Sequence, residues 1–280
     1  MCIISKPVEF VSKTKLYGSL SVDGKNQLTV YSNSVGSITD NNTMILPVPN
    51  PDTVKFVDLS TYSTFFEDLA NCFTNQRHYL YANTRSLAAA YTDSYRPTLE
   101  VYSVGSYRAS IVPSADDFDR LDGAVFKLDK HLAAFLREHY KAPFGFIVCA
   151  LKKGNHTYHP FAYTHKARFE SEIFLPTKHY HNGDGDKIAE WDHEIYTAKS
   201  SLYSHTEDGY RFTGSSRVKW DKLPVEYRWA ANSELCRWTK KGNWKNADLT
   251  PYSFVPRIPL EEDNAYWATL EKVRDILREH

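Results

Sequence analysis

The chain has 280 residues, of which 42% are hydrophobic, and its 34 Lys and Arg residues balance 34 Asp and Glu residues. This length is sufficient for one large or two modest domains with a substantial core. The zero net charge provides no global field toward nucleic acid or an anionic membrane, so the composition does not favour a nucleic-acid binder.

The N-terminus and the cysteines indicate an intracellular protein. The opening residues MCIISKPVEF lack the basic-then-apolar pattern of a signal peptide, and no apolar run approaches the ~18 residues that span a bilayer. Cys2, Cys72, Cys149 and Cys236 form no CxxC motif and no close pair, as expected of reduced thiols. We therefore expect a cytoplasmic protein without a membrane partner.

The first hundred residues alternate as strands do. Two β-branched and aromatic runs at 14–22 and 27–35 flank Asp23-Gly24, which predicts a hairpin. A strand at 44–47 is expected to stop at Pro47, because proline lacks the amide donor that a ladder needs. Farther along, Phe65, Leu69 and Phe73 recur every four residues, and this spacing predicts a helix.

A unit of strand followed by proline recurs along the chain. The four runs end at Pro47, Pro113, Pro176 and Pro256, and they are too degenerate to establish a repeat. Between them, the pattern predicts short helices at 116–121 and 131–140 and strands at 144–151 and 157–163.

The composition changes after about residue 200. Residues 217–245 hold eight Lys or Arg against three Asp or Glu, together with four of the six tryptophans. Such a segment could stack on single-stranded nucleic acid, or it could be an arm that its tryptophans fix to the body of the protein. We expect the arm, because the chain as a whole is neutral. A C-terminal helix is predicted at 261–279, with acidic residues in its first turn.

These elements predict an α+β fold. We expect mixed, largely antiparallel sheets with few short helices over residues 1–200, followed over residues 201–280 by the Trp-rich extension and the C-terminal helix, both packed on that core.

The polar stretch from Phe174 to His193 concentrates the groups that could carry chemistry. His179 and His181 are two residues apart, so on a strand their imidazoles project from one face. Asp192 and His193 begin a later strand-like run, and a turn near Gly183 could bring the two groups together. A hydrogen-bonded rim without chemistry is the alternative.

Cys2 is the candidate nucleophile. Removal of Met1 would expose an α-amine that could act as base for the Cys2 thiol, or one of His179, His181 and His193 could be the general base, oriented by Asp192. The protein would then be a thiol-dependent hydrolase or amidohydrolase acting on a small-molecule or peptide substrate with an amide-like electrophile. A buried small side chain at the start of a strand is the alternative role for Cys2.

A metal centre is the second hypothesis. His179, His181 and His193 could bind one transition metal such as zinc, with His159, Asp192 or Cys2 completing the ligand set. The third hypothesis is a binding or structural protein with no cofactor and no chemistry.

Several short motifs resemble a family of uncharacterised, mostly bacterial proteins. The shared features are an initial Met-Cys, the run Leu46-Pro47-Val48-Pro49, Val112-Pro113-Ser114, Pro176-Thr177-Lys178-His179-Tyr180-His181 and Asp192-His193. The resemblance covers about residues 1–200 and implies no activity. It implies that Cys2, His159, His179, His181 and His193 meet in space.

Overall fold

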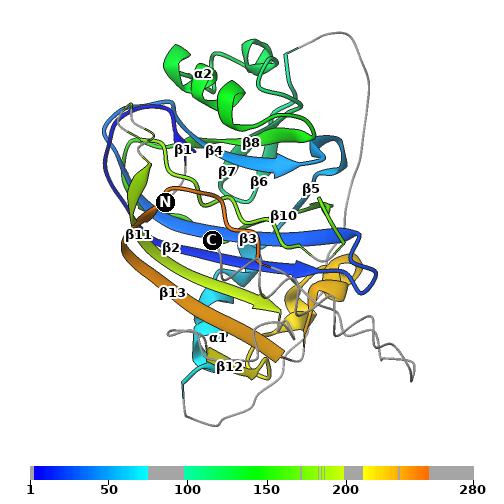
Figure 1. Cartoon of the computed structure of the whole chain (residues 1–280). Coiled ribbons are helices and arrows are strands. Elements are labelled where there is room, and N and C mark those ends of the chain that lie inside the picture. Colours follow the sequence, from blue (N-terminus) through cyan, green and yellow to red (C-terminus); the bar gives the residue numbers. More distant parts are fainter. Residues whose placement is uncertain are drawn as a thin grey trace, which may run out of the picture.

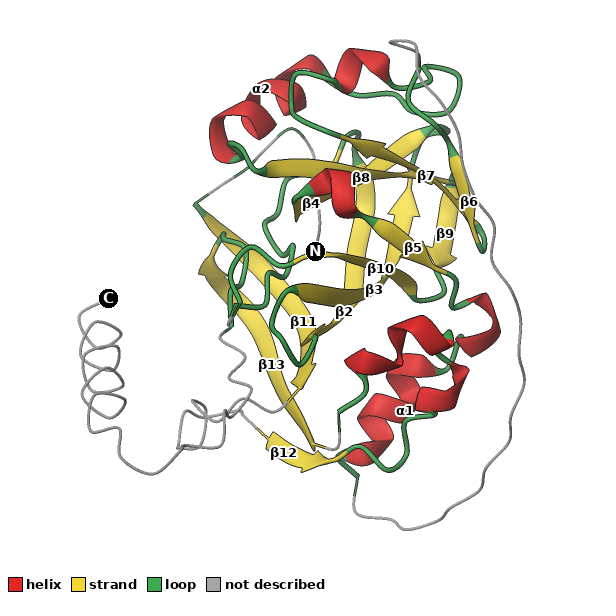
Figure 2. Cartoon of the chain, turned by 90° about the vertical axis from the view of Figure 1, so that its right-hand side faces the viewer, coloured by secondary structure: helices red, strands yellow, loops and turns green. Residues whose placement is uncertain are grey.

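The computed structural model describes residues 3–74, 98–170, 172–181, 183, 185, 187–198, 211–232 and 234–251 (Figure 1). Two β-sheets stack face to face, and each carries a helix on its outer side (Figures 1 and 2). The smaller sheet has the strand order β1 (Ile3–Ile4), β4 (Asn42–Pro49), β8 (Phe144–Leu151), β7 (Tyr107–Val112) and β6 (Tyr102–Val104). Helix α2 (Lys130–His139) covers it.

The larger sheet has eight strands. Its order is β12 (Arg211–Gly214), β13 (Glu234–Lys245), β11 (Ile188–Ala198), β2 (Val8–Leu20), β3 (Asn26–Ser37), β10 (Phe161–Lys166) and β5 (Lys55–Val57), with β9 (Gly154–Thr157) also paired to β3. Helix α1 (Phe65–Cys72) and the 3-10 turns Ser60–Tyr62, Trp220–Lys222 and Val225–Ala230 provide the residues that cover its outer face. Further 3-10 turns lie at Pro51–Thr53 and Phe118–Arg120.

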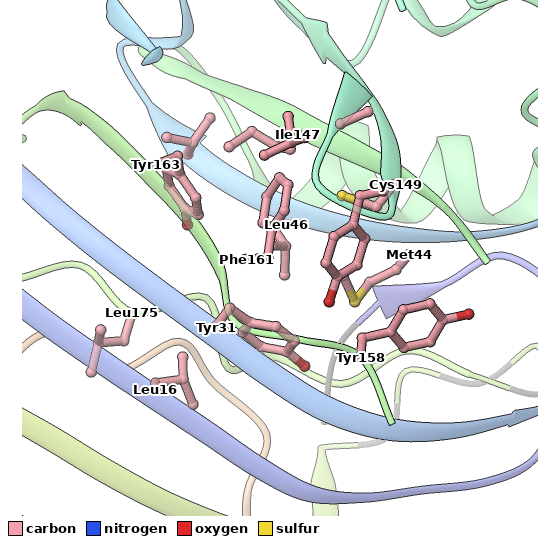
Figure 3. Close-up of a cluster of buried hydrophobic side chains, with 14 of the residues drawn as sticks. Leu16, Tyr31, Met44, Leu46, Ile147, Cys149, Tyr158, Phe161, Tyr163 and Leu175 are labelled. Atoms are coloured by element: carbon pink, nitrogen blue, oxygen red, sulfur yellow. The ribbon is translucent and has the colours of Figure 1, made fainter. Parts of the chain in front are cut away.

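Alternation along each strand sends apolar side chains to both faces of both sheets. The core between the sheets includes Leu16, Tyr31, Met44, Ile147 and Phe161, all fully buried (Figure 3). A second core lies between the larger sheet and α1, and a third lies between the smaller sheet and α2. Burying both faces explains why these strands read as nearly continuous apolar runs.

The β2–β3 hairpin is present where the sequence predicted it; β2 begins six residues before the predicted start and ends at Leu20 instead of residue 22, and β3 extends beyond both predicted bounds. Its turn depends on Gly24, which has φ +71°, and a Cβ at that position would lie 2.1 Å from the carbonyl oxygen of Glu170. Only glycine fits there without movement of the backbone.

The parallel pairing of β2 with β11 joins distant parts of the chain. Its register runs from Thr14 opposite His193 to Gly18 opposite Thr197, whereas the other strand pairs among the described residues are antiparallel. This pairing places the histidine-bearing strand in the middle of the larger sheet.

Strand β4 does not stop at Pro47, contrary to the sequence-based expectation. Pro47 pairs with Phe146 and Pro49 pairs with Phe144. On its other side β4 pairs with β1 only at Met44 and Ile45, so Pro47 needs no donor toward that edge.

Within the strand expected at 171–175, the described residues 172–175 form only isolated bridges, at Glu172 and Leu175. The Gln27 side chain takes the place of a neighbouring strand: its Oε1 accepts from the Phe174 amide at 2.8 Å and its Nε2 donates to the Phe174 carbonyl at 2.6 Å. A side-chain amide therefore satisfies the backbone groups of a buried segment.

The described residues confirm the predicted mixed, largely antiparallel sheets with few short helices, and the fold is richer in sheet than the predicted α+β class implies. The helix predicted at 131–140 is α2, while the one at 116–121 is reduced to the turn Phe118–Arg120. Residues 234–245 of the predicted arm form β13, which pairs with β11 from Leu235 to Lys245. The helix predicted at 261–279 lies outside the described residues.

Candidate functional site

Strand β11 directs His193 toward the core between the two sheets. Ile195 belongs to that core, whereas Tyr196 belongs to the core beneath α1. Because side chains alternate along a strand, Trp191 and His193 share the inner face with Ile195. The rings of Trp191 and His193 lie 4.6 Å apart between centroids, as this face requires.

The segment that carries His179 passes beside the first strand and is held by polar side chains from the end of β13. The Ile4 amide donates to the Tyr180 carbonyl at 2.7 Å, and Ile3 forms a parallel bridge with Tyr180. Asn246 clasps the backbone of His179: its Oδ1 accepts from the His179 amide at 2.7 Å and its Nδ2 donates to the His179 carbonyl at 2.9 Å.

The half-buried carboxylate of Asp248 anchors the two residues that precede His179. Asp248 Oδ1 accepts from the backbone amides of Thr177 and Lys178, each at 2.9 Å, and Asp248 Oδ2 accepts from the Tyr140 hydroxyl at 2.7 Å. Burial raises the pKa of Asp248, while these donors act in the opposite direction. The strap 246–248 thus holds residues 177–179 against the sheet and ties them to α2.

His179, His193 and Trp191 form what we call the histidine cluster. The two imidazoles stack with centroids 5.3 Å apart and an interplanar angle of 7°, and the His179 ring lies 4.9 Å from Trp191. Their exposed fractions are 3%, 0% and 1% for His179, His193 and Trp191. A substrate in solution would therefore not meet these rings directly.

The cluster is electropositive and poorly solvated. Burial lowers the pKa of His179 to about 2, and the neighbouring His181 and Lys240 add to this effect. Lys240 Nζ lies 4.0 Å from the Trp191 ring centroid, and burial lowers the pKa of this ammonium group as well. The His179 imidazole is therefore neutral at physiological pH.

Several buried polar atoms around the cluster have no hydrogen-bond partner among the described residues. They are both ring nitrogens of His179, the Trp191 indole nitrogen and the hydroxyl of Thr14, the strand partner of His193. Buried polar atoms in proteins are nearly always paired, so a group of such atoms marks a place where a polar partner belongs.

His181 lies beyond Tyr180 and is half-buried. The structure thus brings His179 and His193 into contact and keeps His181 near them. It gives Asp192 another partner: Asp192 Oδ2 accepts from the Lys13 backbone amide at 2.8 Å, beside an irregularity in β2 where Lys13 has φ +53°. This carboxylate braces a strained part of the neighbouring strand from the sheet's other face.

His159 lies between β9 and β10 in sequence, and its ring packs against the turn that joins β6 to β7. Its Nε2 accepts from the Ser106 amide at 2.9 Å, its Nδ1 lies 3.0 Å from the Pro160 carbonyl oxygen, and its ring contacts Tyr107. Both ring nitrogens are therefore engaged. Across the residues that the structure describes, no three or more His, Cys, Asp and Glu side chains are grouped so that they could hold a metal ion. The metal centre stays a prediction.

Cys2 lies outside the described residues, whereas the other cysteines provide a contrast. Cys149 and Cys236 are buried, and Cys72 is half-buried. Burial raises the pKa of the Cys236 thiol to about 12, and it also raises the pKa of Cys72. Such thiols are poor nucleophiles at neutral pH.

Sequence reasoning missed four residues of this region: Trp191, Lys240, Asn246 and Asp248. The period of two that placed His193 on a strand also places Trp191 beside it, so this residue carried a usable signal. Lys240 and the strap residues had none, because their positions depend on the pairing of β13 with β11.

No helix in the described part of the chain is both long and apolar enough to span a membrane.

No family model matches the chain. Among solved structures, the chain is similar to baculovirus P35, with 14% identity over 91% of this chain and 100% of that chain and a TM-score of 0.47. A mutated baculovirus P35 after caspase cleavage matches with 14% identity, 87% and 100% coverage and a TM-score of 0.45. P35 in its complex with caspase-8 matches with 12% identity, 88% and 97% coverage and a TM-score of 0.42. No residue of this chain receives a role from these similarities.

Proposed function

We propose that the chain is a thiol-dependent hydrolase in which Cys2 is the nucleophile and His179 is the proton acceptor. The observation that carries this proposal is the parallel bridge between Ile3 and Tyr180. Cys2 precedes Ile3 just as His179 precedes Tyr180, and consecutive Cα atoms are about 3.8 Å apart. The chain leading to Cys2 therefore starts beside the histidine cluster.

The surroundings of His179 suit the activation of a thiol. A neutral imidazole with both nitrogens unpaired among the described residues can take the thiol proton. The resulting imidazolium and thiolate attract each other. This attraction offsets the desolvation cost that keeps the His179 imidazole neutral when no thiolate is beside it. The ammonium group of Lys240 in the same region favours the thiolate further.

The reaction follows from these roles. The thiolate attacks the carbonyl carbon of an amide, the imidazolium gives its proton to the departing amine as the C–N bond breaks, and a thioester remains. Water then cleaves the C–S bond, releasing a carboxylic acid and restoring the thiol. The buried imidazoles would act from behind the nucleophile, so the substrate need only reach Cys2.

Competitive alkylation tests this function, with the other cysteines as internal standards. Limiting iodoacetamide should modify Cys2 before Cys149 and Cys236, which are buried, and peptide mass mapping would identify the modified site. His179→Gln should slow Cys2 alkylation roughly tenfold, because less of the thiol would be ionised. Intact mass of the purified protein would also show whether Met1 is retained.

His165→Gln is the matched control. His165 is another buried histidine, and burial lowers its pKa to about 4. Its Nδ1 lies against the Lys166 carbonyl, away from the bridge between Ile3 and Tyr180. The His165→Gln substitution should therefore leave Cys2 alkylation unchanged. Equal reactivity of Cys2 and Cys149, or equal effects of the two histidine substitutions, would refute the proposed function.

A further inference from the structure

A pocket of about 510 Å³ lies at one end of the smaller sheet, beside the end of α2. Three segments contribute its lining residues: 50–52, which follow β4, 113–116, which follow β7, and 137–144, which lead from the last turn of α2 into β8. All the lining residues are among the described ones. The volume falls within the roughly 300–1,000 Å³ of small-molecule sites, so the pocket has the size of a ligand site.

The walls of this pocket are largely apolar and rigid. The apolar lining includes Pro51, Pro113, Pro143, Ala115 and Phe144. Proline has a fixed φ, and Pro51 is also packed tightly on β8, because a Cβ added to Gly145 would lie 2.6 Å from the Cβ of Pro51. Walls that move little on binding lose little binding energy to ordering, which favours a preformed site.

Two hydroxyl groups on the walls are committed to partners within the protein. The Tyr140 hydroxyl donates to Asp248 Oδ2 at 2.7 Å, and the Ser114 hydroxyl donates to Asp117 Oδ2 at 2.7 Å. These bonds fix both hydroxyl protons. The exposed charged side chains of the pocket are therefore the groups that can turn toward a ligand.

Four charged side chains line the pocket, two of each sign. Arg137 lies in α2 and Lys141 follows it, whereas Asp52 and Asp116 belong to the other two segments, and all four are exposed. Arg137 Nε donates to Asp116 Oδ1 at 2.7 Å, and the Lys141 ammonium group donates to the Arg137 carbonyl oxygen. A cation and an anion thus stand side by side. The guanidinium group has further donors on its Nη atoms and the carboxylate has a second oxygen, so this pair can also bind a ligand.

A ligand that matches this pocket needs two adjacent opposite charges and an apolar body. An α-amino acid carries an ammonium group and a carboxylate on one carbon. We propose that the pocket binds a free α-amino acid with a large apolar side chain, such as phenylalanine. Its carboxylate would lie against Arg137 and Lys141, its ammonium group against Asp116 and Asp52, and its side chain against the proline-rich walls.

The balance of charge in the pocket excludes simpler ligands. Because the two cations and two carboxylates give no net charge, an anion or a cation of the same shape would be attracted by one pair and repelled by the other. The site needs neither Cys2 nor the histidine cluster, so it stands apart from the proposed thiol chemistry.

A ligand-observed NMR titration of the full chain with L-phenylalanine tests the proposal. For a ligand of this size we expect a Kd between about 10 μM and 1 mM. Phenethylamine lacks the carboxylate and 3-phenylpropionate lacks the ammonium group, and each should bind roughly fivefold or more weaker. Glycine keeps both charges without the side chain and should bind roughly tenfold or more weaker. Absence of phenylalanine binding at about 10 mM, or equal affinity for phenylalanine and any of these analogues, would overturn the proposal.

Two double variants locate the ligand. Arg137→Gln with Lys141→Gln should weaken phenylalanine binding roughly fivefold or more, and it should change the affinity for phenethylamine by less than about twofold, because that analogue has no carboxylate. Both side chains are exposed, so the variant should remain folded.

Lys152→Gln with Lys153→Gln is the matched control. These two exposed lysines follow β8, at the opposite end of that strand from Phe144, which lines the pocket. The control should leave phenylalanine binding unchanged. Equal effects of the two double variants, or an equal loss of phenylalanine and phenethylamine binding in the first, would overturn the assignment to this pocket.

Discussion

Replacing Asn246 by alanine tests how the histidine cluster is held in place. The Asn246 side chain is 8% exposed and makes two hydrogen bonds with the His179 backbone, at 2.7 and 2.9 Å. The substitution removes both bonds and leaves a buried amide and a buried carbonyl of His179 without partners. At about 1 kcal/mol per net bond, plus the penalty for the unpaired groups, the expected loss in unfolding free energy is about 2–4 kcal/mol.

That loss is large against the 5–15 kcal/mol typical of folded proteins, on the order of a quarter of the total. Urea denaturation followed by tryptophan fluorescence should show a midpoint lower by roughly 1 M, for an m-value of about 3 kcal/mol/M. Asn232→Ala is the matched control, because the Asn232 side chain makes one exposed hydrogen bond with the Glu234 amide. We expect that variant to lose less than about 1 kcal/mol.

The reasoning would be refuted if Asn246→Ala lowered stability no more than Asn232→Ala did. If that refuting result were accompanied by faster Cys2 alkylation, it would show that residues 177–179 open locally while the sheets stay folded, and that the strap governs access to Cys2 instead of global stability.

The remaining predictions concern the pH dependence of stability and the removal of residues after about 200. Because the pKa values of His165 and His179 are lowered below that of an unfolded histidine, the unfolded state binds more protons, and stability should fall as pH drops below about 6.5. Between pH 7 and pH 5 each histidine should contribute a loss of about 2 kcal/mol, and urea titrations of His165→Gln and His179→Gln should each show a shallower decline by that amount. A decline as steep as in the unsubstituted chain would contradict the assignment. A fragment ending near residue 200 lacks β12 and β13 and leaves Ile195 and Tyr196 beside an open edge, so it should be insoluble or lack a cooperative transition in urea. A soluble fragment with a cooperative transition would show that residues 1–200 fold alone.

The local sequence pattern was sufficient to predict the β2–β3 hairpin and helix α1. The β2–β3 hairpin follows from Asp23-Gly24, and α1 follows from the spacing of Phe65 and Leu69. A turn signal predicts pairing of adjacent strands, and periodicity predicts which face of a helix is buried, so neither prediction requires the distant partner to be known.

Pairing between distant segments could not be predicted in the same way. Nothing near Thr14 indicates that it lies opposite His193, and nothing near Asn246 indicates that it replaces a strand for His179. The expected role of Asp192 as an orienting group followed from its adjacency to His193, yet adjacent residues on a strand face opposite sides. His179 and His181 were expected to project their imidazoles from one face of a strand, and among the contacts described only the His179 ring stacks on His193.

The parallel pairing of β2 with β11 also determines when the protein can acquire its site during synthesis. Ile195 pairs with Leu16 across 179 residues of sequence, and the Asn246 clasp comes later still. Contacts this distant in sequence form slowly, because the chain between them must first be confined, and a ribosome adds only about 5–20 residues per second. The β2–β3 hairpin can form within seconds of emerging, whereas the histidine cluster has to wait for most of the chain. Under the proposed function, the Cys2 thiol would therefore remain unactivated through much of translation, and alkylation of stalled nascent chains should show fast Cys2 modification only in the nearly finished protein.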